Sequence, residues 1–210
     1  MSELAGKLAG KFIVIDGPDG AGKSTQVARL ADWLAAQGVD VVRTRDPGGT
    51  AIGDRVRTIL LDRAAAEMSV ACETMLYMAS RAQLVAEVVR PALAAGKCVL
   101  CDRFVSSTIA YQGAGGADPA AILGVAEVAI GGTWPDLTVI LDIEAERGLA
   151  RVKRGLDRME SKGPDFHRRV REGFLRQVEQ FPLRFAVVSS AGAVDEVAQR
   201  LREAVTSWAF

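Results

Sequence analysis

The sequence has no excess of charge of either sign, because 26 lysines and arginines are balanced by 26 aspartates and glutamates. A general nucleic-acid binder is usually strongly basic, so any phosphate binding here must be local. Three cysteines, Cys72, Cys98 and Cys101, are too few and too unevenly placed for a disulfide scaffold. The chain also lacks an apolar run as long as a membrane span, and its first residues lack the apolar core of a secretory signal. We therefore expect a cytoplasmic protein that binds neither nucleic acid nor a membrane.

The 210 residues, 49% of them hydrophobic, are sufficient for one compact domain spanning 1–210. Short apolar runs alternate with longer segments of helical period, which predicts an α/β fold: a three-layer sandwich around a mainly parallel five-stranded sheet. The expected strands are 11–16, 39–45, 97–102, 137–142 and 185–189. The expected helices are 23–37, 51–62, 69–95, 119–130, 144–154, 165–180 and 194–208.

Residues 17–24, GPDGAGKS, satisfy the phosphate-loop pattern G-x-x-x-x-G-K-[ST] between an expected strand and an expected helix. Glycines let successive backbone N–H groups converge on phosphate oxygens at the start of the helix. Lys23 is expected to reach the outer phosphates of ATP, and Ser24 to help hold Mg²⁺. The expected ATP-binding residues are Gly17, Pro18, Asp19, Gly20, Ala21, Gly22, Lys23, Ser24 and Thr25.

A second anion site and a mobile basic segment favour a small nucleotide kinase among phosphate-loop proteins, and two other classes are disfavoured. The N-K-x-D segment of a switch GTPase is absent, and a motor ATPase or helicase domain usually needs a longer chain. Asp102 ends the expected strand 97–102 and Arg103 follows it, at the sheet edge where such folds bind ligands. Arg103 is suited to a forked contact with a phosphate, and Asp102 to orienting it or supporting Mg²⁺. Arg45 precedes a Pro-Gly-Gly turn at the end of another expected strand.

The stretch 147–171 is the most basic of the chain. A charge run of this kind is commonly a solvated helix face. The alternative is a mobile lid at about 147–163 that closes over nucleotides and brings Arg151, Arg154 or Arg158 onto the migrating phosphoryl group. His167, the only histidine, is expected to be a solvated helix residue and not a catalyst.

The motifs together resemble the thymidylate (dTMP) kinase family. The matching segments are FIVIDGPDGAGKSTQ, RDPGGT, LYMASRAQ, DRFVSSTIAYQG, PDLTVILD and RGLDRME, in the family's order from Phe12 to about Gly173. A glycine after Asp19, together with Arg154, resembles the bacterial type with lid arginines and not the type with an arginine in the loop. The resemblance implies a P-loop nucleoside monophosphate kinase-like fold. It also implies a homodimer, with helix 69–95 as a candidate interface, that converts ATP and dTMP into ADP and dTDP for dTTP biosynthesis.

The resemblance further implies an acceptor site. Tyr77 would stack on thymine and Arg81 would bond its exocyclic oxygen, with Thr108 and Gln112 lining the base pocket and Tyr111 packing where a ribose 2′-hydroxyl would clash. The implied acceptor-binding residues are Asp19, Arg45, Tyr77, Arg81, Arg103, Ser107, Thr108, Tyr111 and Gln112. The implied catalytic residues are Lys23, Arg103, Arg154 and Arg158, and the metal-binding residues are Ser24 and Asp102. Asp46 stands where the family usually has glutamate, which leaves the role of that carboxylate open.

Two other features are interpreted as structural. Cys98 and Cys101 lie three apart on a strand and so face opposite sides, which disfavours a metal or redox site. Asp142 ends an apolar strand with no assigned metal role.

Two other functions stay open: a kinase acting on UMP, CMP or another nucleotide, and a protein that binds ATP as a switch without phosphorylating a small molecule.

Overall fold

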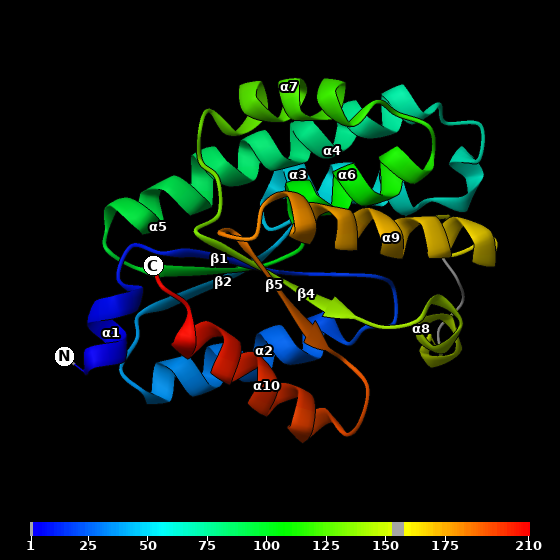
Figure 1. Cartoon of the computed structure of the whole chain (residues 1–210). Helices are drawn as coiled ribbons and strands as arrows, with labels where there is room; N and C mark the ends of the chain where they lie inside the picture. The colour runs from blue at the N-terminus through cyan, green and yellow to red at the C-terminus, as the bar shows by residue number, and fades with distance from the viewer. Residues whose placement is uncertain (1, 153–157) are drawn as a thin grey trace.

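The computed structural model describes residues 2–152 and 158–210, which form a central sheet between two layers of helices (Figure 1). All five strands are parallel, in the order β2-β3-β1-β4-β5. Their bounds are β1 Phe12–Asp16, β2 Val41–Arg45, β3 Cys98–Asp102, β4 Leu137–Asp142 and β5 Phe185–Ser189. The predicted α/β sandwich is confirmed, and the sheet is wholly parallel rather than mainly so.

The three central strands, β1, β3 and β4, form because their apolar side chains are buried on both faces, whereas the edge strands β2 and β5 are largely half-buried or exposed. β1 is buried at all five positions, and β4 at its first five. Fully parallel sheets are covered by helices on both faces, which explains why these runs are continuously apolar and not alternating. Cys98 packs into the core on one face of the sheet and Cys101 into the core on the other, as predicted, and both are buried free thiols.

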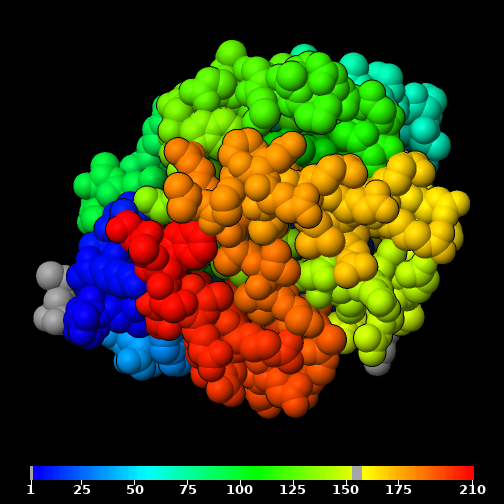
Figure 2. Space-filling model, viewed as in Figure 1, coloured from blue at the N-terminus to red at the C-terminus, as the bar shows by residue number. Residues whose placement is uncertain are grey.

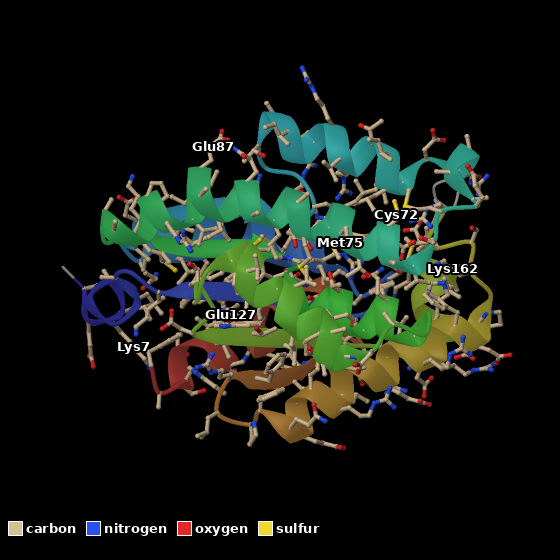
Figure 3. All side chains as sticks on the ribbon, turned by 90° about the horizontal axis from the view of Figure 1, so that it is seen from above. Lys7, Cys72, Met75, Glu87, Glu127 and Lys162 are labelled. Atoms are coloured by element: carbon tan, nitrogen blue, oxygen red, sulfur yellow. The ribbon has the colours of Figure 1, made fainter. Side chains whose placement is uncertain are left out.

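Helices cover the two faces unequally. One face is covered by α1 (Glu3–Leu8), α2 (Lys23–Ala36) and α10 (Val194–Ser207). The other carries α3 (Ala51–Leu61), α4 (Val70–Leu84), α5 (Arg90–Ala94), α6 (Val105–Ala114), α7 (Pro119–Ile130) and α9 (Pro164–Gln180). Seen from above, α4 runs between α3 and α7 (Figure 3), and α9 and α10 cover the side nearest the viewer in Figure 2.

Local sequence explains several helix ends. Ser69 caps α4 by accepting a hydrogen bond from the Cys72 N–H, so the predicted helix 69–95 begins where expected. It continues from α4 through a π-helical turn, Val85–Val89, into α5. α6 was not predicted, because almost all of its residues are buried and the segment therefore lacks an amphipathic period. Among the described residues, none of the helices combines the length and the apolar character needed to span a bilayer.

The predicted site residues lie together at the carboxyl ends of the strands. In the strand register Arg45 lies beside Asp102, and Ile15, just before Asp16, lies on the other side of Asp102. The phosphate loop leaves β1 at this edge, and α6 starts there after β3. The remaining helix, α8 (Ala145–Arg151), follows β4 at the same end of the sheet (Figure 1).

Candidate active site

The phosphate loop turns from β1 into α2 through glycines in the left-handed region. Gly22 is the residue that caps α2, with φ 82°. Gly20 has φ 73°, and a Cβ placed there would overlap the backbone carbonyl of Gly148 in α8. Position 20 therefore requires glycine both for its conformation and for the close approach of two backbones. The loop is packed directly against the first part of the predicted lid.

Lys23 is buried in the loop it belongs to. Its Nζ donates to the carbonyl oxygens of Gly17 at 2.9 Å and Pro18 at 2.6 Å. Burial, reinforced by the charge of Arg103, lowers the pKa of Lys23 to about 8. Lys23, whose positive charge a triphosphate needs, therefore loses its proton at a lower pH than an ordinary lysine.

Ser24 and Asp102 are joined, as the predicted metal pair requires. The Ser24 hydroxyl donates to Asp102 Oδ2 at 2.7 Å. A hydroxyl and a carboxylate are hard oxygen donors of the kind that Mg²⁺ takes alongside water and phosphate oxygens. The residues therefore fit this metal, although nowhere among the described residues do three or more His, Cys, Asp or Glu side chains form a closed protein cage.

Asp19 and Arg103 form the charged centre of the site. Arg103, which follows β3 with φ 70°, places Nη2 2.5 Å from Asp19 Oδ1. The Tyr111 hydroxyl donates to the other oxygen of Asp19 at 2.7 Å. Burial by itself would raise the pKa of Asp19, but Arg103, Lys23 and the Tyr111 hydroxyl outweigh it, so that the pKa is lowered. Asp19 is held as a carboxylate.

Asp16, which the sequence analysis did not single out, organises the start of α6. It is fully buried at the end of β1 and accepts hydrogen bonds from the hydroxyls of Ser106 at 2.6 Å and Ser107 at 2.7 Å. Arg103 Nη1 lies 3.8 Å from the same carboxylate and 3.1 Å from Ser107 Oγ. The only available signal was an acidic residue ending a buried strand immediately before the loop.

Arg81 and Asp46 form a fully buried ion pair at 2.5 Å. Arg81 also donates to the Phe104 carbonyl at 3.0 Å and to Thr108 Oγ1 at 3.1 Å. Burial raises the pKa of Asp46, and the guanidinium of Arg81 works against that rise. The side chain one methylene shorter than the family's glutamate therefore reaches Arg81, which answers the question that Asp46 left open.

Two adjoining cavities bring most of the predicted residues together. The first, of about 80 Å³, is lined by all but one of the predicted acceptor residues: Asp19, Tyr77, Arg81, Arg103, Ser107, Thr108, Tyr111 and Gln112. The second, of about 280 Å³, is lined by the loop, by the metal pair and by the remaining acceptor residue, Arg45. Both are bounded by Asp19, Asp46, Arg57, Arg103 and Glu160. Arg57 and Glu160 were not predicted: Arg57 lies outside the quoted motif segments, and Glu160 ends the segment RGLDRME, in which only the arginines were given a role.

The predicted lid arginines are only partly described. Arg158 is buried, with Nη2 2.5 Å from Glu73 and Nε donating to the Leu60 carbonyl at 3.0 Å. Glu73, a further residue that the sequence analysis missed, also accepts from Gln112 at 2.5 Å. Arg154 lies outside the described residues, and Arg151 donates to the Ser190 carbonyl at 3.1 Å.

His167 is buried, so the expectation of a solvated helix residue was wrong. The imidazole is 2% exposed, its Nδ1 lies 3.8 Å from Asp19 Oδ2, and its Nε2 lies 3.3 Å from the Glu160 carbonyl oxygen. The reason is helical phase, because His167 lies three residues before Val170 and seven before Phe174, both buried on the same stripe of α9. Asp142 is held in a two-bond ion pair with Arg171, at 2.7 and 2.8 Å, consistent with a structural role.

A parallel sheet with a phosphate loop at its centre and a second, arginine-lined cavity beside it defines the nucleoside monophosphate kinase class of phosphate-loop proteins.

Comparisons with known proteins identify the family within this class. The thymidylate kinase family model matches residues 15–201. A thymidylate kinase from Deinococcus radiodurans is 48% identical over 200 residues, covering 94% of this chain and 97% of that protein. Others from Exiguobacterium sp. (46% over 191 residues, 90% of each chain) and Caulobacter vibrioides (45% over 199 residues, 93% and 96%) are similar along almost their whole length. The chain belongs to the thymidylate kinase family.

Proposed function

We propose that this protein is a dTMP kinase that transfers the γ-phosphoryl group of ATP to dTMP in line, giving ADP and dTDP. The observation that supports this most directly is the pair of adjoining cavities, one against the phosphate loop and one against α4 and α6, with Asp19 and Arg103 in the wall between them. Two nucleotides in these cavities meet with their phosphates at Arg103. Family membership supports thymine as the acceptor base.

Each residue has a physical task in this reaction. Lys23 leaves the loop carbonyls to bind the outer phosphates of ATP, and Arg103 exchanges part of its pairing with Asp19 for the acceptor phosphate. A Mg²⁺ ion held near Ser24 and Asp102 would neutralise charge on the donor phosphates. Phosphoryl transfer depends mainly on positioning and on neutralising charge, and the acceptor phosphate, with a second pKa near ~6, is already ionised at neutral pH. The reaction therefore needs no general base.

The deoxyribose preference is assigned to Tyr111. Its hydroxyl is fixed by Asp19, and its ring packs edge-on against Phe174, with the ring centroids 6.1 Å apart, and against the guanidinium of Arg103. A ring held from several sides cannot move aside for an added hydroxyl. Steric exclusion of this kind penalises a ribonucleotide without weakening contacts to the deoxyribonucleotide.

The lid belongs to the same proposal. We treat 1–210 as one kinase domain whose segment at about 147–163 closes over the nucleotides, with Arg154 and Arg158 neutralising the transferred group. For Arg158 this requires release from Glu73. The contact of Gly148 with the loop supports a lid that moves about its α8 end.

Assembly and location are also proposals. The helices α3, α4 and α7 are neighbours (Figure 3). Each carries exposed apolar side chains: Ile52 and Ile59 on α3, Met75 on α4 and Val128 on α7. Family membership and these exposed apolar side chains support a homodimer formed through α3, α4 and α7, and family membership supports a cytoplasmic location. Light scattering coupled to size-exclusion chromatography would give twice the 22.3 kDa chain mass for a dimer and the single mass if the proposal is wrong.

A substrate panel tests the activity. Release of ADP from ATP is expected to depend on dTMP and to be at least about tenfold faster, per kcat/KM, with dTMP than with UMP or CMP, because a single well-placed clash or unpaired polar group costs about that much or more. A coupled assay with and without each nucleotide measures this. A preference for UMP indicates the rival kinase, and ADP release that ignores every acceptor indicates a nucleotide-binding switch.

The pH dependence of ATP use should reflect Lys23. Because its pKa is lowered to about 8, the free enzyme loses this cation as the pH rises through that value. We expect kcat/KM for ATP to be level below about pH 8 and to fall toward about tenfold per pH unit above it, since kcat/KM follows the ionisation of the free enzyme. The matched control is kcat/KM for dTMP at saturating ATP, which should stay level. A flat ATP profile between about pH 7 and pH 9 would contradict the role of Lys23.

A further inference from the structure

Glu73, on α4, is buried at 1% exposure and lines neither nucleotide cavity. Its two carboxylate oxygens contact different parts of the molecule. Oε2 lies 2.5 Å from Arg158 Nη2 and 3.7 Å from Lys162 Nζ, two cations of the proposed lid segment (Lys162 is labelled in Figure 3). Oε1 accepts a hydrogen bond from Gln112 Nε2, on α6, at 2.5 Å. Glu73 therefore joins the lid segment to a residue of the proposed base pocket.

The contact with Glu73 fixes which end of the Gln112 amide faces the first cavity. Glu73 has two cations beside it and acts as a carboxylate, which only accepts, so the end of Gln112 that faces it is the NH₂ group. The other end, Oε1, has no hydrogen-bond partner among the residues that the structure describes, yet it is not one of their enclosed, unpaired polar atoms. Because Gln112 lines the first cavity, its Oε1 offers a hydrogen-bond acceptor there.

The same cavity wall also offers a donor. Arg81 lines the cavity, and four of its five N–H groups have partners among the described residues, which leaves one Nη1–H for a ligand. Thymine and uracil carry an N3–H donor beside the O4 acceptor, whereas cytosine carries an N3 lone pair beside an amino donor. One acceptor and one donor in the wall therefore match a keto pyrimidine at both atoms and match cytosine at neither.

We propose that Glu73 is a positioning residue that makes the acceptor site specific for keto pyrimidines against cytosine, because it holds Gln112 with Oε1 toward N3–H of the base. This inference rests on the proposed dTMP kinase function and adds to it the residue that sets the base preference. Without the carboxylate, the Gln112 amide is free to rotate and to present its NH₂ group, which pairs with the N3 lone pair of cytosine. Glu73 touches no substrate atom itself, so its effect on the base passes entirely through Gln112.

Glu73→Gln, assayed with three acceptors, tests the proposal. The parent is expected to use dTMP at least about a hundredfold better than dCMP, per kcat/KM, because two unmatched polar contacts each cost about tenfold or more. In Glu73→Gln this dTMP/dCMP ratio should fall by at least about tenfold, since the N3 contact no longer favours one base. The dTMP/dUMP ratio should stay within about twofold of the parent, because both bases carry N3–H and O4. A coupled ADP-release assay measures both ratios, and a merely structural loss would lower all three activities alike and move neither.

Three further variants separate the contact with Gln112 from the other contacts of Glu73. In a Gln112→Leu background, Glu73→Gln should change the dTMP/dCMP ratio no further, as expected for two residues that act through one contact. Lys162→Met removes a cation from Oε2 without touching Gln112 and should leave both ratios unchanged. Glu73→Asp keeps the counter-charge for Arg158 but withdraws the carboxylate from Gln112 by one methylene, so its dTMP/dCMP ratio should also fall. This variant decides the question if circular dichroism shows that Glu73→Gln does not fold.

The outcomes distinguish this proposal from the proposed function. A parent that prefers dTMP, together with a dTMP/dCMP ratio in Glu73→Gln within about twofold of the parent, would overturn the role of Glu73 and leave the kinase function standing. An equal fall of the ratio in the Gln112→Leu background would also overturn it, because the effect would not pass through Gln112. A parent whose ADP release ignores every acceptor would overturn both.

Discussion

Arg103→Ala is expected to lower kcat by on the order of a thousandfold while the protein stays folded. The guanidinium lies in the wall shared by the two nucleotide cavities, 2.5 Å from Asp19 and 3.1 Å from Ser107 Oγ. Removing one arginine that neutralises a transferred phosphoryl group costs roughly 10³-fold or more in phosphoryl-transfer enzymes. Steady-state turnover at saturating ATP and dTMP measures the effect.

Two variants make this result interpretable. Arg90→Ala removes an arginine that is bound to the carbonyls of Ile130 and Gly131, away from the nucleotide cavities, and should leave kcat unchanged. Arg103→Lys keeps the charge but loses the forked geometry, so its kcat should lie between those of the parent and of Arg103→Ala. Turnover of Arg103→Ala within about tenfold of the parent would remove Arg103 from the catalytic set.

Asp46→Ala is expected to lower the free energy of unfolding by about 3–5 kcal/mol, because it leaves the guanidinium of Arg81 buried without its counter-ion. Arg81 and Asp46 are 1% and 0% exposed, so water cannot replace the lost partner. A loss of this size is a large part of the total stability of a typical domain. Urea titration followed by circular dichroism measures it.

The matched control is Asp54→Ala, which removes the partner of Arg45 at 3.0 Å in a pair whose side chains are both more than half exposed. Exposed pairs contribute about 0–1 kcal/mol, so this variant should unfold close to the parent. If Asp46→Ala unfolds within about 1 kcal/mol of the parent, then Arg81 is stabilised by the Phe104 carbonyl and Thr108 and not by the buried charge.

Most of the fold was predictable because its signals are local. The observed starts of β1, β2 and β3 differ from the predicted ones by at most two residues, and the bounds of β4 and β5 agree. The buried strands β1, β3 and β4 are mostly continuous apolar runs, and the edge strands β2 and β5 are shorter runs rich in valine. The helix α6 was missed for the opposite reason: burial on nearly all sides removes the periodic contrast between apolar and polar residues on which helix prediction depends.

The residues of the candidate site also fall into two groups: those that a local motif predicted and those that depend on distant contacts. Motifs placed Lys23 and Arg103 at the sheet edge without any knowledge of distant contacts. Glu73 lies outside the motif segments, and Asp16 lies inside one of them but acts through Ser106 and Ser107, about ninety residues away in the chain, so the sequence alone did not single them out. His167 is buried although it lies in a basic stretch of the sequence. The charge of a stretch indicates how exposed the stretch is on average, whereas the position of a residue around the helix decides whether its own side chain is buried.

The contact between Gly20 and Gly148 restricts what the phosphate loop can carry. A side chain at position 20 would have to occupy space where the main chain of α8 already stands, and its backbone would have to stay in the left-handed region. A single Gly20→Arg replacement is therefore insufficient to place a guanidinium in the loop, because α8 would first have to withdraw.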